Sequence, residues 1–400
     1  MISLNSYRYN PNRNNPDKII NRQGCCCVCK CVCCCCVRPC PPPEPEPPLP
    51  PEECPGIEPP PYDAVFISTA EELAGLRNYL GSEYRDRYFR LANDIDLTDY
   101  LSPDGPGYNH GAGWEPIGSW YPTFQATLDG GGYKITGLWS NRPGTDFIGL
   151  FGRIDNGRVI NLNVELASEG IRGSYQVGVI TGAIADGVIR NCHVHGTLAG
   201  TSLTGGITGY VGGSNERHVD IENCSAVCDI SAYYGNTGGL VGFCSGSGTI
   251  GRCYSAGSVT GSSYIGGFAG NASNSRIRNC YTLSDVTAHD ILGGFAGSVG
   301  QYSHITLENC YAAGRVDGES FTAGFIGYNI NSTIISCFFD IDTTGWDYGV
   351  ASGSIDGVTG LTNAQMRTLS IFTNAGWDFY NIWNISPERN SGYPYLRCVY

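Results

Sequence analysis

The feature that most constrains the fold of this chain is an internal repeat. A short motif that ends in glycine recurs through residues 146–345, and its successive last glycines are 30, 27, 33, 28, 27 and 30 residues apart. The copies are Gly149–Gly152, Val179–Gly182, Gly206–Gly209, Gly239–Gly242, Gly267–Gly270, Gly294–Gly297 and Gly324–Gly327. A second motif, an aliphatic residue followed two positions later by a residue that is usually Asn and then by Cys, keeps phase with the first over six units. Two motifs in phase indicate a repeat protein.

Repeats of this length, with short β-type runs and no helical period, predict stacked coils in which each strand pairs in parallel with the next coil. We therefore expect an all-β fold, a right-handed parallel β-helix (β-solenoid) of about seven or more coils with short capping helices. The composition agrees, because only 15% of residues are charged while 56 are Gly and 25 are Tyr. Such a chain must build its surface from uncharged residues and tight turns.

The second motif also predicts a bend. Strict alternation from its aliphatic residue would turn Cys outward, although Cys is among the most buried residue types. A bend at Asn removes the conflict, because Asn tolerates the left-handed backbone region. We predict such bends at Asn191, Asn223, Asn279 and Asn309, with Arg252 and Ser336 at the same place. The cysteines that follow should then form one buried structural column of free thiols: Cys192, Cys224, Cys253, Cys280, Cys310 and Cys337.

The residue after each of these cysteines faces outward by the same parity. Stacking would align Tyr254, Tyr281, Tyr311 and Phe338 into an aromatic row. Such a row is a candidate ligand-facing surface, because aromatic rings bind sugars and proteins through their faces. The alternative is a cross-strand ladder that only stabilises the sheet.

The chain divides into four predicted regions. These are a disordered Cys-rich head with a Pro/Glu-rich spacer (1–61), an N-terminal cap with the first coils (62–145), the repeats (146–345) and a closing segment (346–400). Capping boxes at Ser68–Glu71 and Thr362–Gln365 predict a helix to about Leu80 and a second one before Phe372. The aromatic residues after Gly376 have the bulk to plug the last open coil.

The head carries 11 of the 20 cysteines: Cys25, Cys26, Cys27, Cys29, Cys31, Cys33, Cys34, Cys35, Cys36, Cys40 and Cys54. Three interpretations remain open: disulfide cross-linking between molecules, metal binding by thiolates, and lipidation. The first 24 residues lack an apolar segment, so we expect no ordinary secretory signal peptide. A coat assembled from inside a cell, as on a bacterial spore, fits the cross-linking interpretation.

The repeats resemble the GLUG motif, and Gly149–Gly152 and Gly239–Gly242 fit it best. The Asn-Cys-Tyr segments, Leu91–Leu97 and the ending Tyr393–Leu396 also match what accompanies such repeats. The resemblance covers about residues 62–400 and implies bacterial surface proteins, adhesin-like chains and the N-terminal regions of IgA-specific metallopeptidases. The Cys-rich head is not part of that pattern.

Several functions are disfavoured by the residues. A net charge of −13 disfavours nucleic acid and anionic membranes, and no apolar run is long enough to span a membrane. None of the six His is followed by Glu, so the His-Glu-x-x-His motif of metallopeptidases is missing. Asp94 and Asp96, the strand-face members of a group with Asp99, could form an acid pair or bind Ca²⁺, but a solvated strand face followed by a turn explains them as well. His193 and His195 could share a metal, but no third ligand is in view. We therefore expect no catalytic residue, metal or cofactor.

The sequence thus predicts a non-enzymatic structural or adhesive surface protein, a rigid rod attached or cross-linked through its cysteine cluster. The alternative is a carbohydrate-binding or carbohydrate-cleaving β-helix protein. Expected partners are further copies or other surface-layer proteins, with glycans or host proteins as ligands. The expected location is the bacterial outer surface, as a spore coat or cell-surface component.

Overall fold

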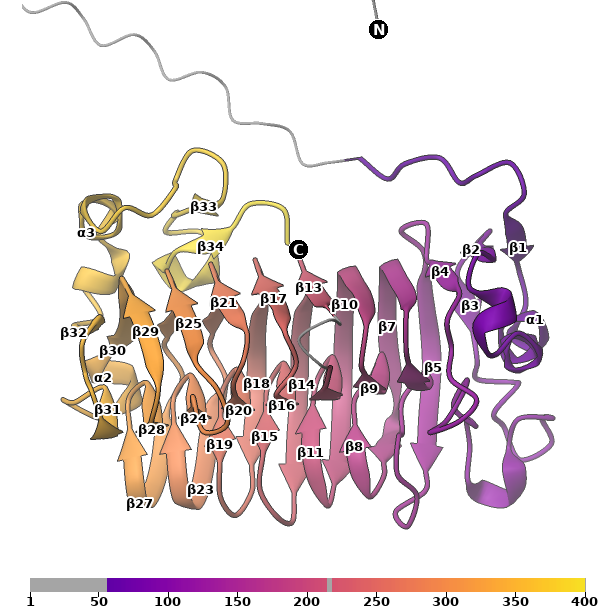
Figure 1. Ribbon diagram of the computed structural model, residues 1–400, viewed down its shortest axis with the longest axis horizontal. Coiled ribbons are helices and arrows are strands. Elements are labelled where there is room, and N and C mark those ends of the chain that lie inside the picture. The colour runs from indigo at the N-terminus through magenta and orange to yellow at the C-terminus, as the bar shows by residue number, and fades with distance from the viewer. Residues whose placement is uncertain (1–55, 214–217, 400) are drawn as a thin grey trace, which may run out of the picture. The chain divides into compact units, whose positions relative to one another are not determined.

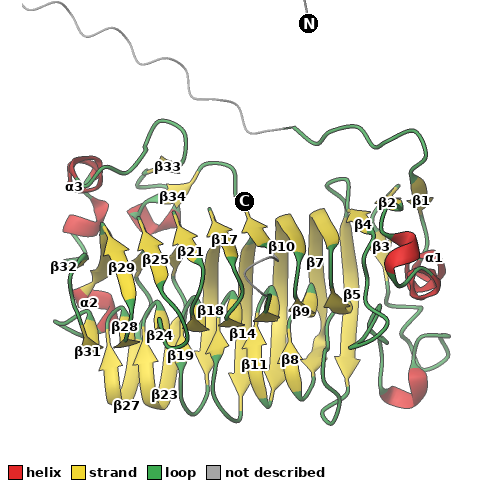
Figure 2. Ribbon diagram, viewed as in Figure 1, coloured by secondary structure: helices red, strands yellow, loops and turns green. Residues whose placement is uncertain are grey.

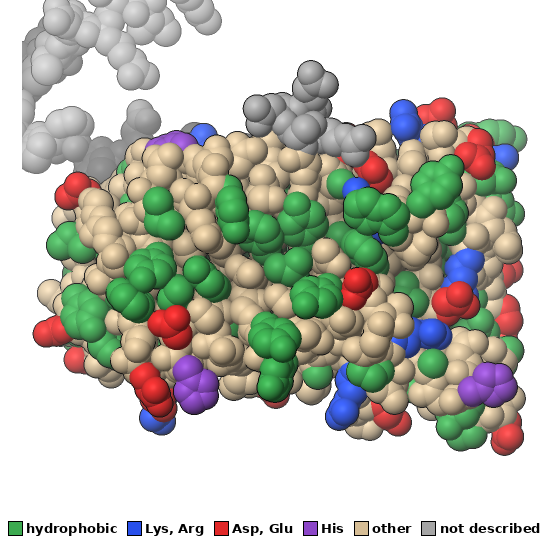
Figure 3. All heavy atoms as spheres, turned by 60° about the horizontal axis from the view of Figure 1, so that its bottom comes forward, with side chains coloured by type: hydrophobic (Ala, Val, Ile, Leu, Met, Phe, Trp, Pro, Cys, Tyr) green, Lys and Arg blue, Asp and Glu red, His purple; other side chains and the backbone are tan. Residues whose placement is uncertain are grey.

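The computed structural model describes residues 56–213 and 218–399. These residues form a parallel β-solenoid of about seven turns with few short helices, so the predicted fold class is confirmed (Figures 1 and 2). Among the described strands, only β33 and β34 pair in antiparallel. Most of the surface seen in Figure 3 is uncharged, as the composition predicts.

Each coil contributes strands to three columns. The first column, before the Asn bend, holds β1 (Val65–Ile67), β2 (Tyr88–Leu91), β4 (Thr127–Asp129), β7 (Gly157–Arg172), β10 (Gly187–Gly200), β13 (Val219–Glu222), β17 (Gly248–Gly251), β21 (Arg276–Arg278), β25 (Ile305–Glu308) and β29 (Ser332–Ile335). The second, to which β7 and β10 also extend, holds β3 (Ile95–Asp96), β5 (Lys134–Asn141), β14 (Ser225–Ala232), β18 (Tyr254–Thr260), β22 (Tyr281–Thr282), β23 (Asp285–Gly293), β26 (Tyr311–Ala312), β27 (Val316–Ala323), β30 (Cys337–Asp340) and β32 (Val358–Leu361).

The third column is the eight-stranded sheet that contains the glycine motif. Its strands are β6 (Phe151–Ile154), β9 (Thr181–Ile184), β12 (Thr208–Val211), β16 (Val241–Cys244), β20 (Ala269–Ala272), β24 (Ala296–Val299), β28 (Ile326–Asn329) and β31 (Val350–Gly353). Short strands β8 (Tyr175–Val177), β11 (Ser202–Gly205), β15 (Thr237–Gly238) and β19 (Ile265–Gly266) lead into it. β33 (Trp383–Asn384) and β34 (Tyr395–Leu396) lie in the closing segment.

The helices differ slightly from the predicted ones. The described α-helices are α1 (Ala70–Gly75), α2 (Ile341–Thr344) and α3 (Leu369–Asn374). The first box is shifted by one residue: Thr69 Oγ1 accepts from Glu72 N, and α1 gives way to a 3₁₀ turn at Leu76–Asn78. The second box forms as predicted between Thr362 and Gln365, but it opens a 3₁₀ turn, and α3 begins only at Leu369.

The predicted bends are confirmed. All six residues of the bend position lie in the left-handed region, with φ of 53° at Asn191, 54° at Asn223 and 52° at Asn279. Arg252 and Ser336 adopt the same conformation, each with φ of 51°. The bend therefore belongs to the coil geometry, and Asn is the residue that tolerates it best.

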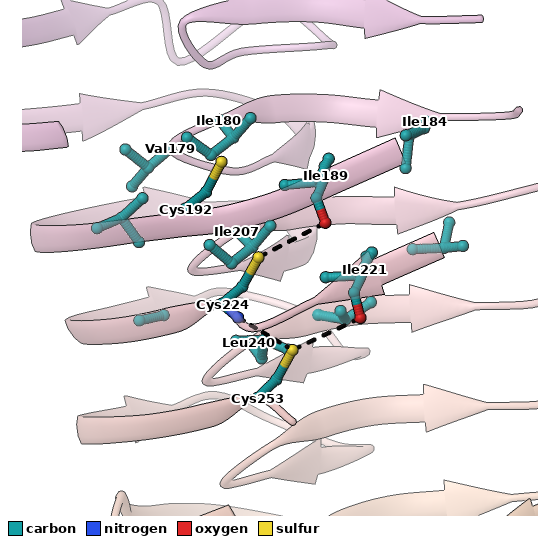
Figure 4. Packing of buried hydrophobic residues seen from close by; sticks show 14 of the residues in the cluster. Val179, Ile180, Ile184, Ile189, Cys192, Ile207, Ile221, Cys224, Leu240 and Cys253 are labelled. Carbon is teal, nitrogen blue, oxygen red and sulfur yellow. Dashed lines mark hydrogen bonds between the residues drawn. The ribbon is translucent and has the colours of Figure 1, made fainter. Parts of the chain in front are cut away.

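The bend directs the cysteines into the core. Cys192, Cys224 and Cys253 occupy the same position of successive coils, where their thiols face backbone carbonyls (Figure 4). Cys224 Sγ, for example, lies 3.6 Å from Ile189 O of the preceding coil. Cys280, Cys310 and Cys337 continue the column, and all six are buried free thiols. Because burial disfavours the charged form, the pKa of the thiol is raised at Cys192, Cys253, Cys310 and Cys337.

The last glycine of the repeat motif is required by close packing between coils. A Cβ atom on Gly270 would lie 2.3 Å from Thr237 N, and one on Gly297 would lie 2.5 Å from the Tyr264 carbonyl carbon. Both contacts are to backbone of an earlier coil, which cannot move aside without breaking its own ladder. The glycine motif is thus required by the close approach of consecutive coils.

Replacing Asn279 should destabilise the solenoid by two separable effects. Asn279→Ala places a Cβ-constrained residue at φ 52°, which costs about 1–2 kcal/mol. It also removes the acceptor of the buried Trp383 indole N–H, 3.2 Å away, which costs about 1–3 kcal/mol. Asn279→Gly should show only the second cost, since Gly accepts positive φ freely. Urea unfolding of both variants measures the difference, and equal losses would disprove the contribution of backbone strain.

Candidate functional site

The Asn bends align their side-chain amides into a ladder along one flank of the solenoid. Asn161 Nδ2 donates to Asp129 Oδ1 over 2.9 Å, and Asn191 Nδ2 donates to Asn161 Oδ1 over 2.8 Å. Asn223 Nδ2 then donates to Asn191 Oδ1 over 3.1 Å, and Arg252 Nε donates to Asn223 Oδ1 over 2.6 Å. The guanidinium of Arg252 thus takes the place of an amide and adds a positive charge to the ladder.

Charged side chains gather beside this ladder. The Glu222 carboxylate lies 3.2 Å from Arg252, 3.6 Å from Arg278 and 3.8 Å from Arg190, measured between nitrogen and oxygen. Glu222 is mostly buried, with 15% of its side chain exposed, whereas each arginine is about 40% exposed. Three cations around one anion leave an excess of positive charge, and the guanidinium groups keep donors that Glu222 alone cannot saturate.

Glu222, Arg190 and Arg252 line a groove of about 710 Å³, which we call the flank groove. Its walls are Ile57, Gly132, Asn161, Asn163, Arg190, Asn191, His193, Glu222, Asn223, Arg252 and Cys398. Successive coils contribute the same positions, so the groove follows the solenoid axis. Its mixture of amides and guanidinium groups suits an extended, hydrogen-bonding ligand that carries negative charge.

The two predicted outward histidines do not act as a pair. His193 lies in the flank groove and its Nδ1 is 2.8 Å from Ser225 Oγ, while His195 is exposed. Burial lowers the pKa of His193, so its imidazole is neutral at pH 7 and adds no charge to the groove. Within residues 56–213 and 218–399, no group of three or more His, Cys, Asp or Glu is placed to hold a metal ion.

The carboxylates of the predicted cluster form hydrogen bonds with neighbouring residues instead of pairing with one another. Asp94 Oδ1 accepts from the backbone of Lys134, and Asp96 Oδ1 accepts from both the backbone and the hydroxyl of Thr98. These hydrogen bonds from Thr98 lower the pKa of Asp96, which keeps it ionised and unsuited to donate a proton. The solvated turn is therefore the better description of this group.

The aromatic row stacks as predicted, but it does not face a ligand. The rings of Tyr254 and Tyr281 are 4.9 Å apart, and those of Tyr281 and Tyr311 are 5.0 Å apart and nearly parallel. Tyr311 is fully buried, and Tyr281 and Phe338 are only 5% and 6% exposed. The prediction of an exposed aromatic row is therefore wrong, because the closing segment packs on it.

The closing segment lies along the side of the last coils and does not plug the open end (Figure 1). Trp377, Trp383 and Tyr393 pack against the aromatic row, with the Trp383 ring 6.2 Å from that of Tyr311. Tyr311 donates its hydroxyl to Pro394 O over 2.7 Å and accepts from Asn390. Parity correctly placed the row outside the coil. No local feature of the sequence indicates that the closing segment covers this row in the folded protein.

The cysteine cluster predicted for cross-linking lies at residues 25–54, outside the described part of the chain, which begins at residue 56. The flank groove was not predicted, because its charges come from different coils. Only an alignment of the repeats by their bend residues would have brought Arg190, Glu222 and Arg278 to one position.

Comparison with known proteins agrees with the repeat. The family described as the GLUG motif matches residues 261–287, which hold β19 to β22 and the start of β23. The chain carries the GLUG motif.

A protein of Evansella cellulosilytica described as a Gly-rich membrane protein is 33% identical over 391 residues, which cover 81% of this chain and 43% of the relative. Halomucin of Haloquadratum walsbyi is 33% identical over 152 residues, covering 37% of this chain and 2% of halomucin.

The chain thus spans less than half the length of the curated relatives it matches. Among solved structures, a Bacteroides ovatus protein described as an immunoglobulin A1 protease shares the fold with a TM-score of 0.50 and 21% identity. The likeness covers 83% of this chain and 92% of that protein. None of the helices in the described residues is long and apolar enough to cross a membrane.

The prediction that the chain is not an enzyme is corrected by this comparison, because a protein with the same fold is described as a protease. Local catalytic motifs reveal only those active sites whose residues have a fixed spacing along the chain. A solenoid can bring catalytic groups together from different coils, so the absence of such motifs does not exclude an enzyme. The likeness itself shows the fold alone and assigns no reaction to this chain.

The burial of tyrosines predicts a loss of stability at high pH. Burial, followed by a hydrogen bond to a carboxylate, raises the pKa of Tyr88 and of Tyr393 to about 12. Their stabilising effect is complete below the unfolded value of about 10 and is lost as pH rises toward about 12. Urea unfolding across this range should show a steep fall in the free energy of unfolding. Tyr393→Phe should make the fall shallower, whereas Tyr233→Phe at an exposed position should leave it unchanged; a fall equal in all three proteins would contradict the assignment.

Proposed function

We propose that the chain is an adhesive segment of a bacterial surface protein, in which a rigid β-solenoid holds an acidic polysaccharide in the flank groove. The observation that carries this proposal is that Arg190 and Arg252 line a groove together with a ladder of amides, while Arg278 contacts the Glu222 carboxylate of the same groove. The relative described as a membrane protein supports a surface location. The unbroken parallel ladder supports rigidity, since each coil is hydrogen-bonded to both neighbours.

The charge of the protein narrows the ligand class. Guanidinium groups bind carboxylates through paired, charge-assisted hydrogen bonds, and the amides of the groove suit hydroxyl groups. The net charge of −13 opposes any polyanion, so an acidic ligand must be held by the local excess of guanidinium groups around Glu222. A polysaccharide with one carboxylate per sugar offers a carboxylate to these guanidinium groups and hydroxyl groups to the amides.

The Cys-rich head supplies the attachment in this proposal. Eleven cysteines followed by a Pro/Glu tract suit cross-linking between copies or to other surface proteins, with the tract as a spacer. The solenoid cysteines are buried and leave no thiol of the repeats for this role. A spore coat or a cell-surface layer would each accommodate such a protein.

Arg252→Asn tests the groove without disturbing the fold, because Asn is the usual residue at that bend. Affinity for an oligogalacturonate, measured by calorimetry, should fall about tenfold or more, as expected for the loss of a hydrogen bond between charged groups. The free energy of unfolding should stay the same or rise by about 0.5–1 kcal/mol, since Asn tolerates φ of 51° better than Arg.

Arg276→Asn is the matched control, because Arg276 is exposed on β21 and pairs with Glu308 outside the groove. Its affinity should equal that of the natural protein. Unchanged binding by Arg252→Asn, or an equal loss in both variants, would show that the flank groove does not hold the polysaccharide.

Oxidation of the full-length chain should give disulfide-linked multimers that a reductant dissolves, visible on non-reducing gels. A chain lacking residues 1–55, which keeps Ile57 and Glu58 on the solenoid, should stay monomeric, because all eleven cysteines proposed for cross-linking are deleted. Stoichiometric zinc in freshly purified full-length protein, with no multimers on oxidation, would contradict cross-linking and favour metal binding by the head.

A further inference from the structure

Strand β7 contains an insertion that its neighbours lack. On β10, His195 and Leu198 are three residues apart, yet their partners Glu165 and Ile171 are six apart. On β5, Leu138 and Ser140 are two residues apart, while their partners Leu166 and Ile171 are five apart. Between Glu165 and Ile171, β7 therefore has three more residues than β10 and, counted from Thr136 to Ser140, two more than β5. The extra residues form a bulge, and such bulges redirect side chains out of the sheet.

A glycine makes this bulge feasible. Gly170 has φ of 65°, and a Cβ atom there would lie 2.4 Å from Thr197 O of β10. The backbone therefore folds tightly against the next coil, and the preceding residue, Glu169, is held outward and exposed. The bulge is a built feature of the fold, supported by packing on both sides.

The bulge creates a groove over Trp139, which we call the bulge groove. One cavity of about 460 Å³ and a second of about 230 Å³ both include Trp139 and Glu169 among their walls. Thr98 and Tyr108 belong to the first, and Asn141 and Arg172 belong to the second. Because they share these two side chains, the cavities are neighbours beside the indole ring, and we treat them together as one trough.

The chemistry of the bulge groove differs from that of the flank groove. Trp139 is partly buried and held edge-to-face by Tyr108, with ring centroids 6.1 Å apart. Glu169 accepts a hydrogen bond from Ser168 over 3.0 Å. Neither Glu169 nor Arg172 forms an ion pair within residues 56–213 and 218–399, although both face the trough.

We propose that the bulge groove binds one or two rings of a neutral oligosaccharide. The indole offers an apolar face for the C–H face of a pyranose, while Glu169 accepts from hydroxyl groups and Arg172 and Asn141 donate to them. One carboxylate and one guanidinium give the trough no net charge, which selects against charged ligands. The site is distinct from the flank groove, since β7 contributes Asn161 and Asn163 to one and Glu169 with Arg172 to the other.

Calorimetry of the full-length protein against cellohexaose, maltohexaose and chitohexaose tests this inference. At least one of these neutral probes should bind, and Trp139→Ala should abolish its binding. Glu169→Gln should weaken it about tenfold, the loss expected when a charged acceptor becomes neutral. Because Trp139 also packs on the core, Glu169→Gln at an exposed position keeps the test valid if Trp139→Ala fails to fold.

Trp120→Ala is the control, since Trp120 is 66% exposed and stacks under Arg153 away from the trough. It should bind the neutral probe as the natural protein does, and so should Arg252→Asn. Failure of all three probes to bind, or unchanged binding by Glu169→Gln and Trp139→Ala, would overturn the bulge groove. Binding of oligogalacturonate is measured separately, so either groove can fail without the other.

Discussion

At each coil the chain turns through a residue whose φ lies between 51° and 54°, from Asn161 to Ser336. This left-handed bend is the constraint on which the rest of the solenoid depends. It reverses the inward and outward parity of the strand, so that Cys enters the core and the next residue leaves it. Without the bend, the aliphatic residue and the cysteine of each motif could not both be buried.

Stacking converts this local geometry into long-range order. Equivalent bends at one flank bring amides within hydrogen-bond distance, so Asn191, Asn223 and Asn309 each donate to the amide oxygen of the coil before. The same stacking brings Arg190, Glu222 and Arg278 to equivalent positions of their coils, with Gly251 in the coil between Glu222 and Arg278. The flank groove is therefore a by-product of the ladder.

The two grooves arise in different ways. The flank groove depends on regular repetition, whereas the bulge groove depends on three residues that break the repetition in β7. Regular coils provide a uniform surface, and an insertion provides a concave one because it lifts side chains above their neighbours. The closing segment shows a third outcome: it covers a regular aromatic row, so stacked rings that could serve as a surface become a second core.

The sequence by itself determined the solenoid, the six bends from Asn191 to Ser336 and the burial of the cysteine column, because these follow from short-range parity repeated in phase. Only the tertiary structure decided which outward residues remain exposed. Tyr311 and Tyr254 have the same local pattern, yet the closing segment buries one fully and the other partly. The tertiary structure also decided that Arg190 and Arg252, from separate coils, share the Glu222 carboxylate, since register between coils brings together residues that lie about 30 positions apart. The local sequence pattern determines whether a side chain points into or out of the coil. Which residues it contacts in the neighbouring coils is determined by stacking alone.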